Sequence, residues 1–538
     1  SIYGGVYWDA QELLLEDVER IEVLRGPSAT AWGPRAANGV VNIITKKAAE
    51  TQGGYLEAGG GGHERVFGGA RFGGKLGSRA HYRVSGQMLR RHHTWREDSG
   101  DGADGWNAER TGVRLDWYAT ERDEVNLSGN AYDTRTGQNA GLPFPLPYGG
   151  AAVAELHGHG GDALAHWRHD STDGAQTDVQ FSQDWAANRG WRWDENVYNL
   201  DFDLRRRTRS FGGHSLQYGI NYVQTRCSLT DFTDPGADSV HRSPRRFSVF
   251  LDDEWALTDA LSLSLGGRIE HNTYTGIELQ PEIRLAWEPK RGNTLWFATA
   301  RGARPPTPLE TDARGEIAQI GSIGGVPVAM CLADNPGIRS ETVRAVEAGY
   351  RADVTAKVSV DLAAYWNSYA GLRSVALAGF SPGAPARLYV KFDDRDSGRV
   401  TGVESNVEWR PRNNLRLVAN HTWTRLVVKE AGGPRLPVGA GGPGSVPTHE
   451  GQLRSYLTLP RKVTFDTALY VSGPLERFSL PAHARLDARL AWGGGEHTEF
   501  SVTGSELQGG SHIEFYSEFS GRPGAFGRSL YGMVAWRF

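Results

Sequence analysis

The sequence predicts an all-β chain whose strands close into a transmembrane antiparallel β-barrel. Three observations support this prediction. Segments of roughly ten residues alternate between apolar and polar side chains, the connections alternate between short and long, and the chain ends on an aromatic strand. Strands of a membrane barrel need this period of two, because one side faces lipid and the other a wet lumen. Counting such segments gives about 22 strands, in the range of large plugged barrels.

Composition agrees with strands and excludes other classes. Glycine supplies 69 of 538 residues, aromatics 10% and methionine only 3, a mixture that favours strands, turns and bulges. A mean hydropathy of −0.47 excludes a helical membrane protein, as does the lack of an apolar run near ~18 residues. The net charge is −4 with acidic and basic residues scattered, so we expect no nucleic-acid partner.

The alternation is clear in individual segments. In 463–471 the odd positions are mostly apolar, with Val463, Phe465 and Leu469 among them, whereas the even positions are mostly polar. The segment 261–270 repeats the pattern with leucines and Ile269 on one face and serines, Arg268 and Glu270 on the other. Such segments predict strands with one apolar and one polar face.

The connections fall into two classes. Short ones are expected at Thr120 to Glu124, Thr258 to Ala260, Pro411 to Asn414 and Leu459 to Lys462. Long ones are expected at His92 to Gly105, Arg135 to His157, Arg226 to Ser243, Ala303 to Ile338, Lys429 to Pro447 and Leu507 to Gly527. A barrel inserted from one side has short turns on that rim and long loops on the other, so we expect the long loops to face outside.

The first fifty residues differ from the repeat. Val18 to Leu24 predicts a short strand, Gly26-Pro27 a turn, and Val40 to Thr45 a second apolar strand. The run from Val18 to Pro27, then Trp32-Gly33, then the run from Asn38 to Lys46, resembles the end of the plug domain of TonB-dependent receptors. Asn38-Gly39 departs from the paired glycines that many members carry. The resemblance implies the C-terminal portion of a plug domain at 1–50, inside the lumen of a barrel at 51–538.

Further segments resemble the barrel of the same family. They are Arg301 to Thr307 with Glu310, Asn335 to Ile338, Ser340 to Thr342, Glu347 to Tyr350, and Gly402 to Glu404. Ser505-Glu506-Leu507 stands where the family usually shows Asn-Leu. The last strand, with Trp536 and Phe538 on one face, resembles the signal that the barrel assembly machinery reads.

The resemblance implies a receptor in the bacterial outer membrane that binds a scarce solute and imports it to the periplasm with energy delivered by TonB. A ferric siderophore is the expected cargo; cobalamin, haem or a saccharide are alternatives, and a passive porin-like channel is an alternative of another class. No histidine lies between Arg304 and Asn335, where a haem receptor of this family is expected to carry one.

Other expectations concern partners and chemistry. TonB would act through a segment upstream of Ser1, where the export signal is also expected. The remaining partners are an iron chelate or similar small ligand, outer-membrane lipid and the assembly machinery, which would engage the Phe538 strand. We expect a monomer with no resident cofactor and no metal site. We expect no enzyme, because the sequence has no Gly-x-Ser-x-Gly and no His-Glu-x-x-His.

Candidate site residues form two groups. By resemblance, Arg25 would face Glu347 and Glu404 and hold the plug to the barrel, since arginine pairs carboxylates bidentately. Ligand capture would fall to aromatic and arginine side chains of the outer loops, which stack on flat ligands or pair with anionic groups. The same aromatics also suit the girdles of any membrane barrel. The candidates are Trp95, Arg96, Trp106, Arg189, Trp191, Trp193, Tyr516 and Phe519.

The two cysteines, Cys227 and Cys331, both fall in expected outer loops. An oxidising exterior permits a disulfide there. Because a disulfide needs Cα atoms within about 7 Å, the sequence leaves open whether the two residues pair.

Overall fold

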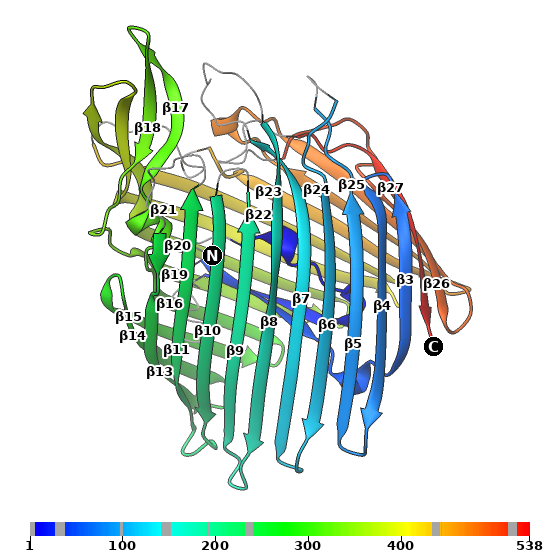
Figure 1. Cartoon of the computed structure of the whole chain (residues 1–538). Coiled ribbons are helices and arrows are strands. Elements are labelled where there is room, and N and C mark those ends of the chain that lie inside the picture. Colours follow the sequence, from blue (N-terminus) through cyan, green and yellow to red (C-terminus); the bar gives the residue numbers. More distant parts are fainter. Residues whose placement is uncertain are drawn as a thin grey trace.

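The computed structural model describes residues 6–26, 38–96, 100–140, 152–190, 193–231, 240–432, 442, 444–514 and 524–538. Twenty-two strands within this part of the chain close into one barrel, each antiparallel to its neighbours in the ring (Figure 1). The predicted fold class and strand number are therefore confirmed.

The strands of the ring follow one another in chain order. They are β3 (Gly53–Gly61), β4 (Glu64–Leu76), β5 (Ala80–Arg91), β6 (Trp106–Tyr118), β7 (Asp123–Ala140), β8 (Ala152–Asp170), β9 (Gln176–Arg189), β10 (Trp193–Arg207), β11 (His214–Asp231), β13 (Arg245–Thr258), β14 (Leu261–Asn272), β15 (Gly276–Lys290), β16 (Asn293–Arg304), β19 (Glu341–Thr355), β20 (Val358–Ser381), β21 (Ala386–Arg412), β22 (Leu415–Lys429), β23 (His449–Leu459), β24 (Val463–Ser472), β25 (His483–Gly493), β26 (Thr498–Ser505) and β27 (Ser529–Arg537).

Three further strands lie outside the ring on the side of the long loops. β12 (Val240–Arg242) adds to the end of β11, and β17 (Gly315–Ile323) and β18 (Val326–Leu332) form a hairpin that projects from the outer mouth (Figure 1). β18 also pairs in parallel with Ala386 to Val390 of β21. Among the described residues, the helical elements on this side are α2 (Pro308–Asp312) and η4 (Glu476–Phe478). In the part of the chain that is described, no helix has the length and apolar character needed to cross a membrane.

Side-chain exposure follows the predicted alternation. On β27, Val534 is 43% and Trp536 46% exposed, whereas Ala535 between them is 1% exposed. Outward-facing tryptophans gather near the short turns and the C-terminus, where an aromatic girdle of a membrane barrel lies. Seven described ones are Trp117, Trp167, Trp255, Trp287, Trp409, Trp492 and Trp536. The outer surface therefore has the lipid-facing character that the sequence predicted.

The last strand closes the ring against the first. β27 pairs with β3, and the backbone groups of Gly54 and Phe538 exchange hydrogen bonds of 2.6 and 3.0 Å. A Cβ atom at Gly54 would overlap the ring of Phe538, so glycine is required where the terminal aromatic ring crosses β3. Closure leaves no free sheet edge in the wall.

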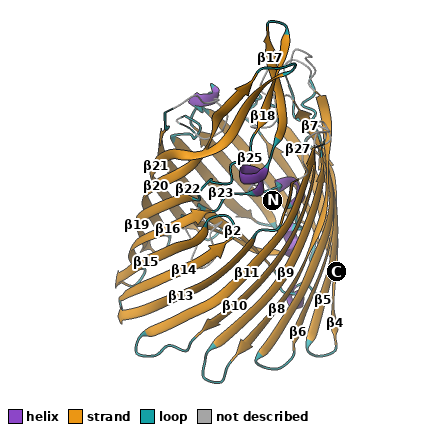
Figure 2. Cartoon of the chain, turned by 60° about the vertical axis from the view of Figure 1, so that its left-hand side comes forward, coloured by secondary structure: helices purple, strands orange, loops and turns teal. Residues whose placement is uncertain are grey.

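The N-terminal segment lies inside the barrel (Figure 2). Its described residues contain three short 3-10 helices and a two-stranded antiparallel sheet, and the segment joins the wall at β3. Its elements are η1 (Trp8–Ala10), η2 (Leu15–Asp17), β1 (Val18–Arg25), β2 (Gly39–Thr45) and η3 (Ala48–Glu50). The two predicted strands of the segment are thus present, and Ile21 of β1 faces Ile43 of β2 in register.

Candidate functional site

A buried carboxylate anchors the N-terminal segment to the barrel wall. Asp17, at the end of η2, lies 3.0 Å from Arg71 on β4 and 3.3 Å from Arg83 on β5. All three side chains are less than 10% exposed. Charges so removed from water are stable only while paired, so this triad ties η2 firmly to two neighbouring strands.

A second buried carboxylate holds the point where the segment enters the wall. Asp116 of β6 is 0% exposed and accepts the backbone N–H of Ala48 at 2.6 Å. It also accepts hydrogen bonds from Arg114 at 3.0 Å and Asn126 at 2.7 Å. Arg114 in turn donates to the hydroxyl of Thr45. The start of η3 is therefore fixed to β6 by charge-assisted bonds.

Less buried ion pairs extend this attachment around the lumen. They are Glu12 with Arg91 of β5 at 2.9 Å, Lys47 with Glu124 of β7 at 2.7 Å, and Glu16 with Arg537 of β27 at 3.1 Å. These contacts thus concentrate on the strands flanking the β27–β3 closure. The sequence did not single out these residues. The sequence did contain one signal, because alternation alone assigns the charged residues on one face of β4 to β7 to the lumen.

The predicted contact of Arg25 with Glu347 and Glu404 lies on the opposite side of the barrel. Arg25 Nη1 contacts Glu404 Oε2 of β21, with the arginine 66% and the glutamate 20% exposed. Glu347 of β19 instead lies against Gly26, whose φ of +74° and lack of a Cβ both suit the close approach of that carboxylate. The structure therefore brings all three residues to one place but pairs Arg25 with Glu404.

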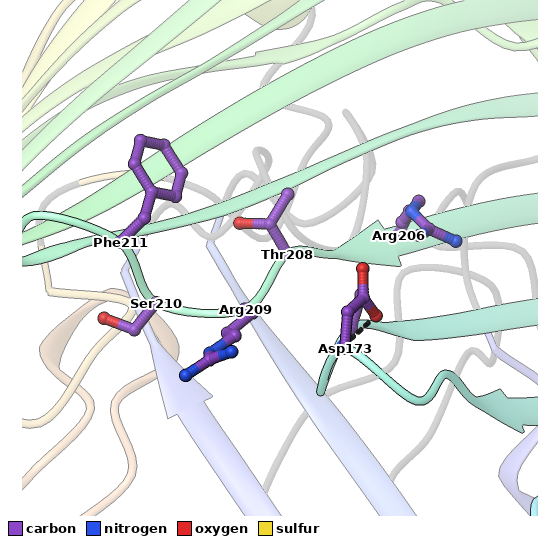
Figure 3. Close-up of a pocket in the computed structure, with 7 residues that line it drawn as sticks. Asp173, Arg206, Thr208, Arg209, Ser210 and Phe211 are labelled. Carbon is purple, nitrogen blue, oxygen red and sulfur yellow. Dashed lines mark hydrogen bonds between the residues drawn. The ribbon is translucent and has the colours of Figure 1, made fainter.

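Two cavities lie at opposite ends of the barrel. One, of about 680 Å³, opens in the lumen towards the long loops between β22 and β25, and its lining includes Glu450, Tyr470, His483, Arg485 and Glu514. The other, of about 550 Å³, lies among the short turns before β9 and after β10. Figure 3 shows Arg209 and Phe211 pointing to different sides there. Only the first has charged groups gathered on the luminal side, so it is the better candidate for a solute.

Comparison with known proteins identifies the family. The family model described as TonB dependent receptor-like, beta-barrel matches residues 51–505. The chain belongs to the TonB-dependent receptor family. The predicted resemblance is therefore confirmed, and the barrel is one of the bacterial outer membrane.

Individual relatives share this architecture at low identity. An iron-regulated outer membrane virulence protein of Vibrio cholerae is 25% identical over 78% of this chain and 65% of its own length. A ferric enterobactin receptor of Pseudomonas aeruginosa is 24% identical over 61% of this chain and 52% of its own length. The solved siderophore receptor PirA of Acinetobacter baumannii superposes with a TM-score of 0.80 at 16% identity, over 97% of this chain and 85% of that one. The chain thus spans about two thirds or less of the two curated relatives.

In this TonB-dependent receptor, Arg304 of the segment Arg301 to Thr307 lies in an ion cluster at the outer mouth. Arg304 contacts both Glu310 of α2, at 2.8 Å, and Glu341 of β19. Arg373 of β20 lies 3.1 Å from Glu310, which also accepts the backbone N–H of Thr307 at 2.8 Å and so caps α2. Residues from the two predicted sequence signatures therefore meet in one cluster.

The cluster should make the outer mouth sensitive to acid. Burial raises the pKa of Glu310, but Arg304 and Arg373 outweigh burial and hold that pKa below its ordinary value of about 4.3. Because the pKa of Glu310 is lower in the folded state than in the unfolded state, its ion pairs stabilise the loop that contains α2 fully at pH values above the ordinary pKa. This stabilisation is lost as pH falls through the pKa of the folded state. We expect hydrogen exchange of the α2 amides, corrected for intrinsic rates, to accelerate only below about pH 4. Glu310→Gln should abolish this acid transition, and an identical transition in both proteins would contradict the assignment.

The outer-loop candidates have different positions. Trp95 is 48% exposed and pairs through its backbone with Ala525, whereas Arg96 is 8% exposed. Trp106 begins β6, and Cζ of Arg91 lies over its indole ring, 4.3 Å from the ring centroid. Arg189 is exposed at the end of β9. Trp191, Tyr516 and Phe519 lie outside the described residues, and for Trp193 the structure describes only the backbone at the start of β10.

Cys227 and Cys331 are not joined in a disulfide, so the pairing considered from the sequence is not formed. The two residues belong to different parts of the outer mouth. Cys227 lies on β11, paired with β10 and β12, and its thiol is 3.7 Å from the carbonyl of Arg242. Cys331 lies on β18, between β17 and β21. Strand pairing therefore holds each cysteine among other neighbours.

Proposed function

We propose that this receptor imports a ferric siderophore into the periplasm with energy delivered by TonB. Family membership over 51–505, together with a closed barrel whose lumen holds an anchored segment, carries the proposal. Two relatives, a ferric enterobactin receptor and a siderophore receptor, favour an iron chelate over cobalamin, haem or a saccharide. A passive porin would have no use for a tethered segment inside its pore.

Residues 1–50 would be the end of the plug domain, and Arg25, Glu347 and Glu404 would form its movable contact. The Arg25–Glu404 pair supports this role, since its arginine is exposed, and pairs open to solvent are weak and exchange readily for water. The buried triad of Asp17 with β4 and β5, and the contacts of Asp116 on β6, would instead stay in place. Movement of the plug would then begin at β19 to β21.

Capture would occur at the outer mouth. The candidates of the long loops, with Trp95 the exposed aromatic among those described, would contact the chelate before it reaches the luminal cavity. Binding and release of an intact chelate involve no covalent step, so we propose no enzymatic activity and no resident cofactor. The proposed partners are TonB, outer-membrane lipid and the assembly machinery acting on the Phe538 strand. The closed ring has no free sheet edge, which suits a monomer.

Growth rescue tests the cargo. The receptor is expressed in a Gram-negative strain that lacks its own siderophore receptors and grows on iron-limited medium with one ferric chelate at a time. Rescue is expected with at least one siderophore, with catecholates the first class to test. Vitamin and haem auxotrophs form the parallel arms. Rescue confined to cobalamin or haem, or no rescue by any ferric chelate, would reject the iron proposal.

A further inference from the structure

Three metal-ligating side chains converge at the outer end of the lumen. His483 begins β25, whereas His512 and Glu514 lie on the connection between β26 and β27. One ligand atom from each lies within 4.8 Å of the others. The two imidazole rings stack with centroids 4.3 Å apart, and Glu514 Oε1 is 3.2 Å from His512 Nε2. Two separate segments thus present an N,N,O donor set.

A buried carboxylate stands behind one of these ligands. Glu506 Oε2 is 3.6 Å from Nδ1 of His512, on the ring edge opposite Glu514. The Glu506 side chain is 3% exposed, and its Oε1 makes no hydrogen bond within the described residues. A carboxylate beside the second ring nitrogen commonly orients a metal-binding histidine. Glu506 therefore already lies beside Nδ1 of His512, while Nε2 of the same ring faces the proposed metal position.

The backbone shows that Glu506 occupies its place at some strain. Its φ of +56° lies in the left-handed region, which glycine and asparagine adopt more readily than glutamate. The side chain also receives a hydrogen bond from Gln508 and approaches Arg485 at 3.6 Å. A residue disfavoured by its backbone and buried with a charge requires a compensating interaction nearby. A cation bound to His512 would add to the compensation that Gln508 and Arg485 provide.

The local charge and space also suit a cation. Arg485 is paired with Asp487 at 2.8 Å, which leaves the carboxylates of Glu506 and Glu514 incompletely neutralised. His483 and Glu514 line the luminal cavity of about 680 Å³, so a fourth ligand position would face water. Two imidazoles, one carboxylate and one open position are a common ligand set of Zn²⁺.

We propose that His483, His512 and Glu514 bind a divalent transition-metal cation of the Zn²⁺ class, oriented through Glu506. The bound cation links the last outer connection to the start of β25 and closes one side of the luminal cavity. This site is independent of ferric-siderophore import, since it needs only the bare cation. This proposal departs from the expectation from the sequence that the chain has no metal site. His483 is distant in the sequence from His512 and Glu514, so residue spacing did not indicate the group.

The test uses the folded receptor in detergent, stripped with EDTA and freed of the chelator, and titrated calorimetrically with ZnSO₄ in the absence of siderophore. We expect one strong Zn²⁺ site per chain. His483→Ala and His512→Ala should each weaken it at least ~10-fold, and Glu506→Gln by roughly 10- to 100-fold. Retention of wild-type affinity in the histidine variants, or no stoichiometric binding by wild type, would overturn the proposal.

A matched control lies on the outer face of the nearby strands β22 and β23. His421 of β22 and His449 of β23 stack at 5.4 Å with 3.2 Å between ring nitrogens, but belong to no three-ligand group in the described chain. The double variant His421→Ala, His449→Ala should bind Zn²⁺ as wild type does. Carbethoxylation of the wild type needs no variant: Zn²⁺ should protect His483 and His512 but not the control pair. Equal modification with and without Zn²⁺ would refute the site.

Discussion

Asp17→Asn is expected to release η2 from the barrel wall, with a loss of about 3–5 kcal/mol in local stability. The substitution keeps the shape of the side chain but leaves Arg71 and Arg83 facing each other without their shared anion. Because about 1.4 kcal/mol corresponds to a factor of ten, exchange of the amide hydrogens in 15–25 and 39–46 should accelerate by roughly a hundredfold or more. Mass spectrometry of the folded receptor measures this exchange.

The exposed pair on the opposite side supplies the comparison. Glu404→Gln removes the partner of Arg25, but Arg25 is 66% exposed, so the loss should stay within about 0–1 kcal/mol. In planar bilayers, Asp17→Asn should also raise leak conductance more than Glu404→Gln does. Wild-type exchange rates in Asp17→Asn, or a larger effect from Glu404→Gln, would show that the buried triad does not anchor the segment.

Asp116→Ala is expected to free η3 from β6, at a local cost of about 2–4 kcal/mol. The carboxylate is fully buried and accepts from the backbone of Ala48, from Arg114 and from Asn126. Removing it leaves the half-buried guanidinium of Arg114 and the buried N–H of Ala48 without that acceptor. We expect faster cleavage between residues 46 and 52 in limited proteolysis, while the barrel keeps its resistance to SDS at room temperature.

Asp116→Asn separates charge from hydrogen bonding. The amide keeps an acceptor for the N–H of Ala48 but cannot neutralise Arg114, so its effect should lie between wild type and Asp116→Ala. Cleavage of Asp116→Ala at the wild-type rate would contradict the anchoring role. A collapse of SDS resistance in both variants would place Asp116 in the stability of the wall instead.

The barrel was predictable from the sequence because its requirement is local. Each strand must place apolar side chains towards lipid at alternate positions. The lipid-facing side of Val463 to Val471 and of the last strand can therefore be identified from each segment alone. The rim that carries the turns was equally predictable, because the connections there are short. The strand number followed from the same count, and the tryptophan positions near the short turns confirm the orientation of the faces.

Strand ends were less predictable. The connection expected from Arg135 to His157 is shorter, because β7 continues to Ala140 and β8 begins at Ala152. Within the expected loop from Ala303 to Ile338 lies the hairpin of β17 and β18. Beyond the membrane the alternation of lipid and lumen no longer applies, so backbone pairing continues without a pattern in the side chains.

The anchoring residues depend on contacts between distant segments. Nothing in the sequence around Asp17 and Asp116 marks them out. Packing of the N-terminal segment on the wall brings Asp17 to Arg71 and Arg83, and brings Asp116 to the backbone N–H of Ala48. The same holds for His483, which meets His512 through strand order rather than spacing. The sequence left open whether Cys227 pairs with Cys331, because a shared loop location does not imply proximity, and the structure does not join the two in a disulfide.

Uptake of radioactive iron tests import most directly. Cells that express the receptor, and isogenic cells without TonB, are incubated with ⁵⁵Fe bound to the siderophore that rescues growth. We expect surface binding in both strains and accumulation only where TonB is present, abolished by a protonophore. Equal accumulation without TonB would contradict active transport and indicate a passive pore.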